Sequence, residues 1–189
     1  MNVYDFVNGT CTQMVEWSGA LGSDITFFLS RGTAYCTGRG EIMTPTDPLL
    51  KAGTKLCIVK PNVGLSTPSV FKALNYDELS QLDPDEVLLP AFLEQAEKDI
   101  ENVSAEYFLN DLEPPAFRCV PELLELKQAL QKVSGFKHVM MSGSGTSIFC
   151  LGQPDDPESF QKEFGEKDNL QVFSTEFINR DDGVWFDRP

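Results

Sequence analysis

Hydrophobic and polar positions along the chain predict a series of short elements from about residue 55 onward. Residues 56–59 form an apolar run between two lysines, which predicts a buried strand. A hydroxyl residue and a proline within 66–68 are typical of a helix start. Val70, Phe71 and Leu74 follow at helical spacing, so the strand is expected to lead into a helix.

Two longer segments predict further helices. Residues 86–101 place apolar side chains on one helical face, and Pro90 is expected to bend or restart that helix. The clearest helical pattern covers residues 121–134, where a proline opens the helix and Gly135 closes it.

The last third of the chain returns to strands. Residues 138–141 and 148–151 predict two strands joined by a turn, a helix follows from residue 156 to Gly165, and residues 170–177 alternate as a strand. The order from residue 55 is therefore β, α, α, α, β, β, α, β. This order predicts an α+β fold with helices on one face of an antiparallel sheet, close to a ferredoxin-like split βαβ.

The first 50 residues do not fit this plan. They contain an apolar element at 25–29 and a strand candidate at 33–36, and the segment 45–53 has the composition of a linker. The expected organisation is residues 1–50 as the end of a preceding domain and residues 51–189 as a second domain.

The charge of the chain limits its partners. The 189 residues carry a formal net charge of −14, so nucleic acid and anionic membrane surfaces are not expected as partners. The charge is uneven, because residues 76–113 hold twelve acidic side chains and one basic one. The segments 31–75 and 114–154 are net positive, and they are candidate places for an anionic ligand.

Cysteine and histidine usage argues against a metal or disulfide framework. The five cysteines are scattered without a C-x-x-C pair, and His138 is the one histidine, so we expect no metal site and a reducing compartment. No apolar run approaches the roughly 18 residues that span a bilayer. The first ten residues contain an acid and no base, so neither a secretory signal nor a transit peptide is expected.

The turn between the two predicted strands is the most concentrated glycine and hydroxyl segment of the chain. Its successive glycines and hydroxyls can direct donors at a phosphate, although the segment matches neither the Walker A nor the dinucleotide pattern. A tight hairpin loop without function is the alternative, and the turn taken alone favours it. The residues are Ser142, Gly143, Ser144, Gly145, Thr146 and Ser147.

Three other features have both a functional and a structural interpretation. Asp24 stands before an apolar element, where a carboxylate can accept a proton from a substrate hydroxyl or cap a helix. Phe71 can stack on a nucleobase or fill the core. Residues 110–115 are either polar ligand groups on a rigid loop or the boundary before the next helix.

The order of these features is more specific than any one of them. Five blocks resemble, in the same order along the chain, the second half of the 4-diphosphocytidyl-2-C-methyl-D-erythritol kinases of the GHMP superfamily. Their residues look most like those of the plant and algal plastid type. The blocks are residues 22–28, 32–41, 66–72, 110–117 and 142–147. The resemblance implies a GHMP kinase C-terminal domain preceded by a remnant of the N-terminal, ATP-binding domain.

The resemblance also implies an activity and site residues. The family transfers a phosphoryl group from ATP, with Mg²⁺, to the 2-hydroxyl of its diphosphocytidyl substrate in non-mevalonate isoprenoid synthesis. Asp24 matches the catalytic aspartate, Phe71 the aromatic residue that stacks on cytosine, and Thr67 lies in the same substrate segment. The loop Ser142 to Thr146 matches a glycine-rich turn near the phosphates. A plastid location follows from the plant-type resemblance, whereas the chain expressed as given, without a transit peptide, is expected to be soluble in the cytoplasm. A homodimer is left open.

The chain departs from the family in one large respect. The long loop of the P-x-x-x-G-L-G-G-G-S-S kind, which holds the ATP phosphates, is absent, as are the partner lysine of the catalytic aspartate and the second cytosine-stacking aromatic. We therefore expect the isolated chain to have little or no activity. The alternatives are a non-catalytic α+β interaction or ligand-binding module and another GHMP small-molecule kinase.

Overall fold

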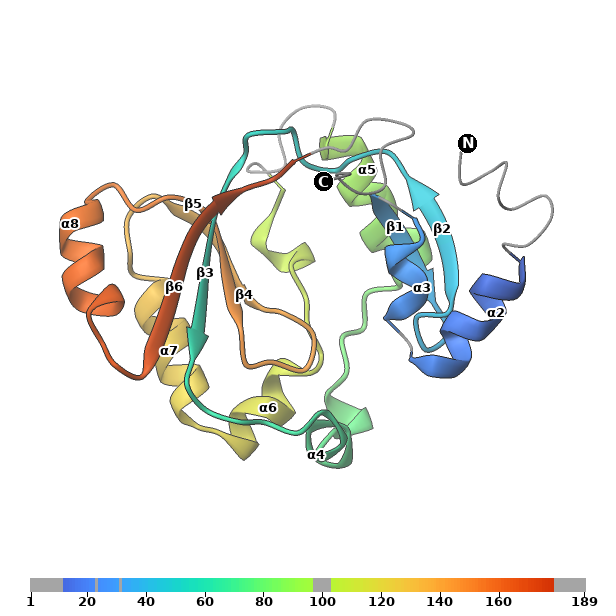
Figure 1. Cartoon of the computed structure of the whole chain (residues 1–189), viewed down its shortest axis with the longest axis horizontal. Helices are drawn as coiled ribbons and strands as arrows, with labels where there is room; N and C mark the ends of the chain where they lie inside the picture. Colours follow the sequence, from blue (N-terminus) through green and yellow to red (C-terminus); the bar gives the residue numbers. More distant parts are fainter. Residues whose placement is uncertain (1–11, 23, 31, 97–102, 179–189) are drawn as a thin grey trace, which may run out of the picture. The chain divides into compact units, whose positions relative to one another are not determined.

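The computed structural model describes residues 12–22, 24–30, 32–96 and 103–178. The chain divides into two compact units (Figure 1). The first unit comprises residues 1–51 and 178–189, and the second comprises residues 52–177.

The described residues of the first unit form two helices and a hairpin. The helices are α2 (Thr12–Leu21) and α3 (Ile25–Phe28), and the hairpin is formed by β1 (Thr33–Thr37) and the antiparallel β2 (Ile42–Thr46). Thr26 of α3 is fully buried, and its hydroxyl shares a 2.9 Å hydrogen bond with that of Ser18 in α2. The second strand was not predicted, because it lies partly in the segment that has the composition of a linker.

The second unit contains a four-stranded sheet. Its strands are β3 (Lys55–Pro61), β4 (Phe136–Met141), β5 (Ile148–Gly152) and β6 (Leu170–Glu176). Its α-helices are α4 (Thr67–Lys72), α5 (Leu89–Ala96), α6 (Glu113–Cys119), α7 (Glu122–Leu130) and α8 (Pro157–Phe160). Shorter helical segments are Tyr76–Glu78, Pro84–Leu88, Ala105–Tyr107 and Gln161–Gly165.

The order of the strands confirms the predicted α+β fold. The sheet runs β4-β5-β3-β6, and each neighbouring pair is antiparallel. Since β3 and β4 are both antiparallel to β5 between them, they run in the same direction. The carboxyl ends of β3 and β4 therefore meet at one edge of the sheet, and the segments that follow these strands start there.

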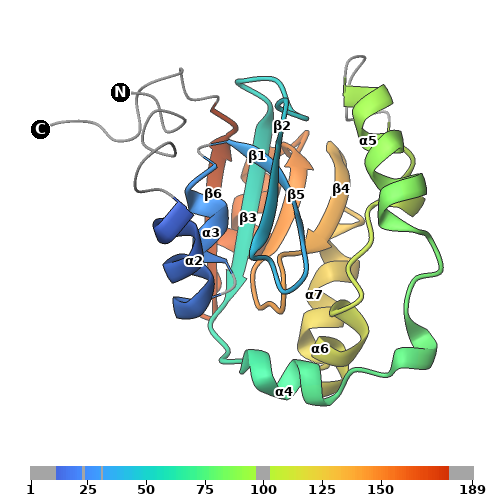
Figure 2. The ribbon, with the colours of Figure 1, turned by 90° about the vertical axis from the view of Figure 1, so that its right-hand side faces the viewer.

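One face of the sheet carries the hydrophobic core. Cys57 and Val59 of β3 and Ile148 and Cys150 of β5 are buried on this face by the helices (Figures 1 and 2). The cluster is completed by Met141 of β4 and by the helical side chains of Val70, Ala116, Leu123, Leu130, Phe160 and Phe164. Burial of these apolar side chains is the main contribution to the stability of the unit.

The opposite face is covered at β4 by an aromatic stack. Phe108 lies on the ring of His138, with the centroids 3.8 Å apart, and Phe92 of α5 contacts Phe108 edge to face. In Figure 1, α5 lies on the side of the sheet away from α7 and α8. His138 is therefore a buried residue of the sheet, 8% exposed, rather than a surface ligand.

Two glycines fix the end of the β4–β5 hairpin that is remote from its turn. Gly135 and Gly152 have φ values of 97° and 102°, which favour glycine. A Cβ atom at Gly152 would lie 2.4 Å from the Gly135 carbonyl oxygen, and one at Gly135 would lie 2.1 Å from that of Gln153. The backbones approach so closely that no side chain fits at either position.

The elements differ from the predictions mainly in length. The helix expected over 121–134 ends at Leu130, and the helix expected over 86–101 consists of a wide turn, Pro84–Leu88, followed by α5. Residues 97–101 of that prediction lie outside the described residues. Helix α6 was expected only as a boundary, because Pro114 and Pro115 follow its first residue, yet prolines are tolerated in a first helical turn.

Replacement of a core leucine of α7 is expected to destabilise the second unit. Leu130 is fully buried, whereas Leu124 on the same helix is 40% exposed. Leu130→Ala should lower the free energy of unfolding by about 3 kcal/mol, since it removes buried surface and leaves a cavity. Leu124→Ala should cost under about 1 kcal/mol. Urea unfolding followed by circular dichroism measures both, and equal losses would contradict the core as described.

Candidate functional site

Helix α4 presents one of the predicted site residues to solvent. Val70 is fully buried and anchors the helix to the core, while Phe71, the next residue, is 55% exposed. Because successive side chains of a helix point about 100° apart, burial of the first directs the second away from the core. An exposed phenyl ring on an anchored helix is available to stack on a planar ligand.

The turn after β4 is an ordered glycine-rich loop. The amide of Ser142 donates to the carbonyl of Ser147 at 2.8 Å, and the amide of Gly145 donates to the carbonyl of Ser142 at 3.0 Å. Gly143 and Gly145 have φ values of 54° and 93°. The amides of Gly143 and Ser144 donate to no other group among the described residues. These amides and the serine hydroxyls are the donors that such a loop can offer to an anion.

The loop and α4 are joined directly. The hydroxyl of Thr67, at the start of α4, shares a 2.8 Å hydrogen bond with the hydroxyl of Ser144, although 77 residues separate them in the chain. Gly145 lies against the side chain of Met141, because a Cβ atom there would come within 2.8 Å of the sulfur. The sheet topology explains the meeting, since α4 follows β3 and the loop follows β4 at the same edge.

The structure thus brings together most of the site residues predicted in the second unit. Thr67 and Ser144 are in contact, Gly143 and Gly145 shape the loop, and Thr146 is 8% exposed with its hydroxyl 3.4 Å from the Val63 carbonyl oxygen to which it donates. Their side chains supply hydroxyls and no charge.

Sequence reasoning did not find the side chains that hold the loop. Asn110 donates from its Nδ2 atom to the carbonyl oxygens of Met141 and Gly143, both at 2.8 Å. Glu113 accepts the amide of Met141 at 2.8 Å. The motif 110–115 was recognised as polar and rigid, but nothing in its spacing indicates a partner about 30 residues further along the chain.

The predicted catalytic aspartate lies in the first unit. Asp24 occupies the N-cap position of α3 with φ −85° and ψ −9°, and its side chain makes no capping hydrogen bond. It is exposed. The carboxylate is therefore accessible to a ligand and is not engaged in a capping hydrogen bond.

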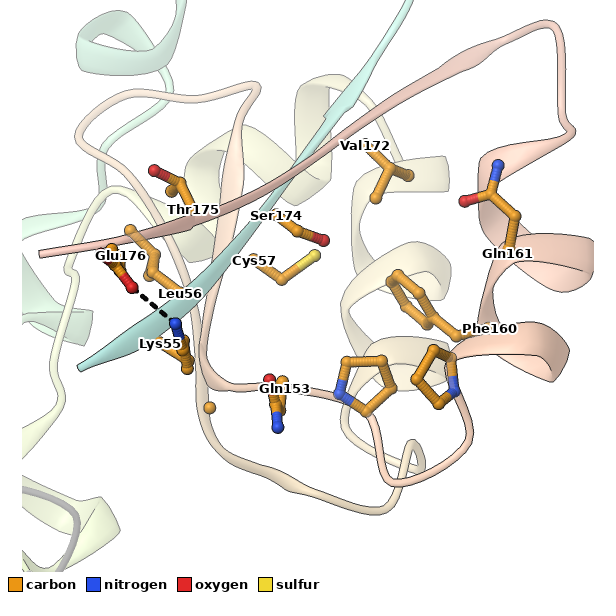
Figure 3. A pocket seen from close by; sticks show the side chains of 13 residues that line it. Lys55, Leu56, Cys57, Gln153, Phe160, Gln161, Val172, Ser174, Thr175 and Glu176 are labelled. Carbon is orange, nitrogen blue, oxygen red and sulfur yellow. Dashed lines mark hydrogen bonds and ion pairs between the residues drawn. The ribbon is translucent and has the colours of Figure 1, made fainter. Parts of the chain in front are cut away.

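A pocket of about 510 Å³ opens elsewhere on the second unit (Figure 3). Lys55 and Cys57 of β3, Gly152 at the end of β5, and Glu176 of β6 are among its lining residues, and Lys55 pairs with Glu176 at 2.5 Å. These positions are the start of β3 and the ends of β5 and β6. The pocket therefore lies at the edge of the sheet opposite the glycine-rich loop and is not the predicted site.

Two thiols are buried in the centre of the sheet. Cys57 and Cys150 face each other across β3 and β5, and burial raises the pKa of the Cys57 thiol to about 11. Burial, together with the neighbouring Cys57, also raises the pKa of Cys150. Both thiols stay protonated at neutral pH and serve as apolar core groups.

No described helix combines the length and the apolar character needed to cross a membrane. Within the same residues, no group of three or more histidine, cysteine or acidic side chains comes together as a metal site.

Comparison with known proteins identifies the class of the domain. Residues 88–169 match the family model described as GHMP kinases C terminal. The fold is also that of a homoserine kinase from Cytophaga hutchinsonii, with a TM-score of 0.55, 16% identity, and coverage of 82% of this chain and 51% of the other. Over residues 88–169 the chain therefore has the sequence pattern and fold of a GHMP kinase C-terminal domain.

Within this class, the chain is similar to 4-diphosphocytidyl-2-C-methyl-D-erythritol kinases, which confirms the resemblance seen in the motif blocks. It is 41% identical over 177 residues to the one from Protochlamydia amoebophila, covering 94% of this chain and 52% of the relative. It is 39% identical over 176 residues to the chloroplastic one from Mentha piperita, covering 92% and 42%. The chain spans about half the length of these relatives.

A solved structure supports the same similarity. The crystal structure of a 4-(cytidine 5'-diphospho)-2C-methyl-D-erythritol kinase superposes with a TM-score of 0.63 at 26% identity. The match covers 86% of this chain and 56% of the other.

The burial of the two sheet thiols predicts a pattern of chemical labelling. At pH 8 iodoacetamide should modify the exposed Cys119 and leave Cys57 and Cys150 unmodified, since only about one in a thousand Cys57 thiols is ionised there. Labelling of Cys57 should rise as the pH approaches 11. Peptide mass spectrometry reads each site, and the urea-unfolded chain serves as the control in which all cysteines react. Equal rates at Cys57 and Cys119 in the folded chain would contradict the assignment.

Proposed function

We propose that this chain is the substrate-binding half of an ATP-dependent kinase that phosphorylates the 2-hydroxyl of 4-diphosphocytidyl-2-C-methyl-D-erythritol in non-mevalonate isoprenoid biosynthesis. The relatives named above support the reaction. The observation that carries the proposal is the hydrogen bond between Thr67 and Ser144, because it joins the helix that bears an exposed aromatic ring to a loop with free backbone donors.

In this proposal the second unit binds the diphosphocytidyl group. Phe71 stacks on the cytosine ring, and the adjacent Thr67 hydroxyl belongs to the same substrate surface. The amides of Gly143 and Ser144 and the hydroxyls of the loop donate to phosphate oxygens. Positioning of this kind is the main contribution of a protein to phosphoryl transfer, because the phosphoryl group itself needs little covalent assistance.

Asp24 is the proposed catalytic residue. Its carboxylate orients the 2-hydroxyl and accepts its proton as that oxygen bonds to the γ-phosphorus of ATP, while the bond from this phosphorus to the bridging oxygen breaks and ADP leaves. The exposed position of Asp24 at the start of α3 supports this role, since the side chain is not engaged in a cap.

ATP and Mg²⁺ belong to the proposed reaction by family. ATP supplies the phosphoryl group, and residues 1–50 are proposed as part of the domain that binds it, with residues 51–189 as the C-terminal domain. The described residues hold no group suited to a metal ion, so no step is assigned through Mg²⁺. A plastid location is proposed because relatives from Mentha piperita and rice are chloroplastic.

Two other functions have specific support. Another GHMP kinase is a candidate because a homoserine kinase has a similar fold. Binding of a ligand that contains no cytosine would favour this candidate. The first unit exposes Trp17 at 62% and Phe28 at 67%, with Ile25 and Phe27 also exposed, which favours an interaction module. Size-exclusion chromatography over a range of concentrations separates the module from the kinase, because a monomer throughout argues against a self-associating module.

Removal of the proposed stacking ring should weaken cytosine binding. Phe71→Ala is expected to raise the Kd of the chain for cytidine diphosphate about tenfold, the usual worth of one stacked base. Phe173→Ala, which removes a comparably exposed ring from β6, should leave the Kd unchanged. Isothermal titration calorimetry measures both constants. Equal effects of the two substitutions, or no binding of cytidine diphosphate by the unaltered chain, would refute the proposed substrate site.

The 189 residues alone should phosphorylate the diphosphocytidyl substrate far more slowly than a complete kinase does. Complete kinases typically turn over at about 1 to 100 per second. The reason for the slower rate is that the family's ATP phosphate loop is absent from this sequence. A coupled assay with ATP, Mg²⁺ and the diphosphocytidyl substrate measures the rate. Turnover within the ordinary kinase range would show that the sequence carries its own means of holding ATP.

A further inference from the structure

The glycine-rich loop is held from outside by one asparagine. Asn110 lies just before α6, and its Nδ2 atom donates to the carbonyls of Met141 and Gly143. Its Oδ1 atom accepts the amide of Leu112 at 3.0 Å. This arrangement fixes the orientation of the side-chain amide, because a flipped group would set an oxygen against two carbonyl oxygens.

A partly buried ion pair supports the same strand end. One oxygen of Glu113 accepts the amide of Met141, and the other pairs with Lys127 of α7 at 2.5 Å. The side chains of Glu113 and Lys127 are 12% and 16% exposed. The amide and the carbonyl of Met141 are thus both bound by side chains from the first turn of α6 and the residues just before it.

Helix α6 also holds the other proposed ligand-bearing segment. Arg118 donates to the carbonyl of Ala73, at the end of α4, and pairs with Glu78, both at 2.8 Å. Ala116 of α6 and Val70 of α4 are fully buried in the same core cluster. The segment from Asn110 to Arg118 is therefore a common support for the loop and for α4.

We propose that Asn110 is a positioning residue that holds the glycine-rich loop in the conformation that binds a phosphate group. The proposal rests on the proposed function, since it assigns the loop a phosphate ligand. Without the two donated hydrogen bonds, the Gly143 carbonyl has no partner among the described residues, and a glycine at positive φ restrains the chain least. The loop then occupies the binding conformation for a smaller fraction of the time, and the observed Kd rises in inverse proportion.

The contacts of Asn110 separate this role from stability of the core. Asn110 is half-buried and is not a member of the hydrophobic cluster. The carbonyl of Gly143 that it binds belongs to an exposed residue. Loss of the side-chain donor is therefore expected to act on the loop more than on the sheet beneath it.

The test replaces the Nδ2 donor of Asn110 and keeps the shape of the side chain. Asn110→Asp puts an oxygen where Nδ2 stands, so both carbonyl contacts become repulsive, while an oxygen remains for the Leu112 amide. Asn169→Asp makes the same atomic change at an exposed position before β6 and serves as the control for charge. Asn110→Ala removes the donor without adding charge, and it is the second variant if the aspartate destabilises the chain.

Two measurements are made on the full chain and its variants. Amide hydrogen exchange by NMR should show the Ser142 and Gly145 amides exchanging at least tenfold faster in Asn110→Asp, with the Cys150 amide unchanged. Calorimetry should show the Kd for cytidine diphosphate rising at least tenfold and the Kd for cytidine, which lacks phosphate, unchanged. Asn169→Asp should change neither.

Each of the other outcomes overturns a stated part of the proposal. Unchanged loop exchange in both Asn110 variants would overturn the positioning role. Faster loop exchange with an unchanged Kd for cytidine diphosphate, or an equal loss of cytidine affinity, would overturn the link between the loop and phosphate. If the unaltered chain binds neither compound, the proposed function fails, and the exchange rates still decide whether Asn110 positions the loop.

Discussion

The position of β5 between β3 and β4 is the constraint on which the second unit depends. Because both neighbours are antiparallel to β5, the two strands end at one edge of the sheet, and the segments that follow them start side by side. If β3 and β4 ran in opposite directions, their carboxyl ends would lie at opposite edges of the sheet, and Thr67 and Ser144 could meet only through long connections. The same strand directions place the pocket beside Lys55 at the opposite edge of the sheet, away from the proposed site.

The core and the glycine-rich loop of the second unit are held by different kinds of interaction. Apolar side chains from β3, β5 and the helices form the core and set the position of the sheet. The loop, in contrast, contributes only Thr146 to the buried residues and depends on side chains that come from the start of α6. A rigid core therefore carries a loop whose conformation is set by a few hydrogen bonds, and those bonds can change without loss of the fold.

The sequence predicted the elements whose signals are local. The apolar run at 56–59 and the stripe of helix α7 were recognised because each pattern lies within a few residues. Helix α6 was missed because two prolines in its first turn are as common in loops as in helix starts. Strand β2 was missed because Pro45 and the turn residues beyond it are more typical of a linker.

The candidate site shows the same difference between residues with a local sequence signal and residues whose partners are distant in the chain. Thr67, Phe71 and the glycine-rich loop were found through the order of motif blocks, whereas the roles of Asn110 and Glu113 depend on partners about 30 residues away. Such contacts are properties of the fold. A single sequence without its sheet topology does not contain them.

The close approach of Gly135 to Gly152 has a consequence for how this hairpin can evolve. Neither backbone position has room for a side chain, so the two strands cannot slide past each other to absorb an added or deleted residue. A change in the number of residues at 142–147 would have to be accommodated within the turn itself. The loop can therefore change in chemistry by substitution, and a change in its length would leave the register of the two strands as it is.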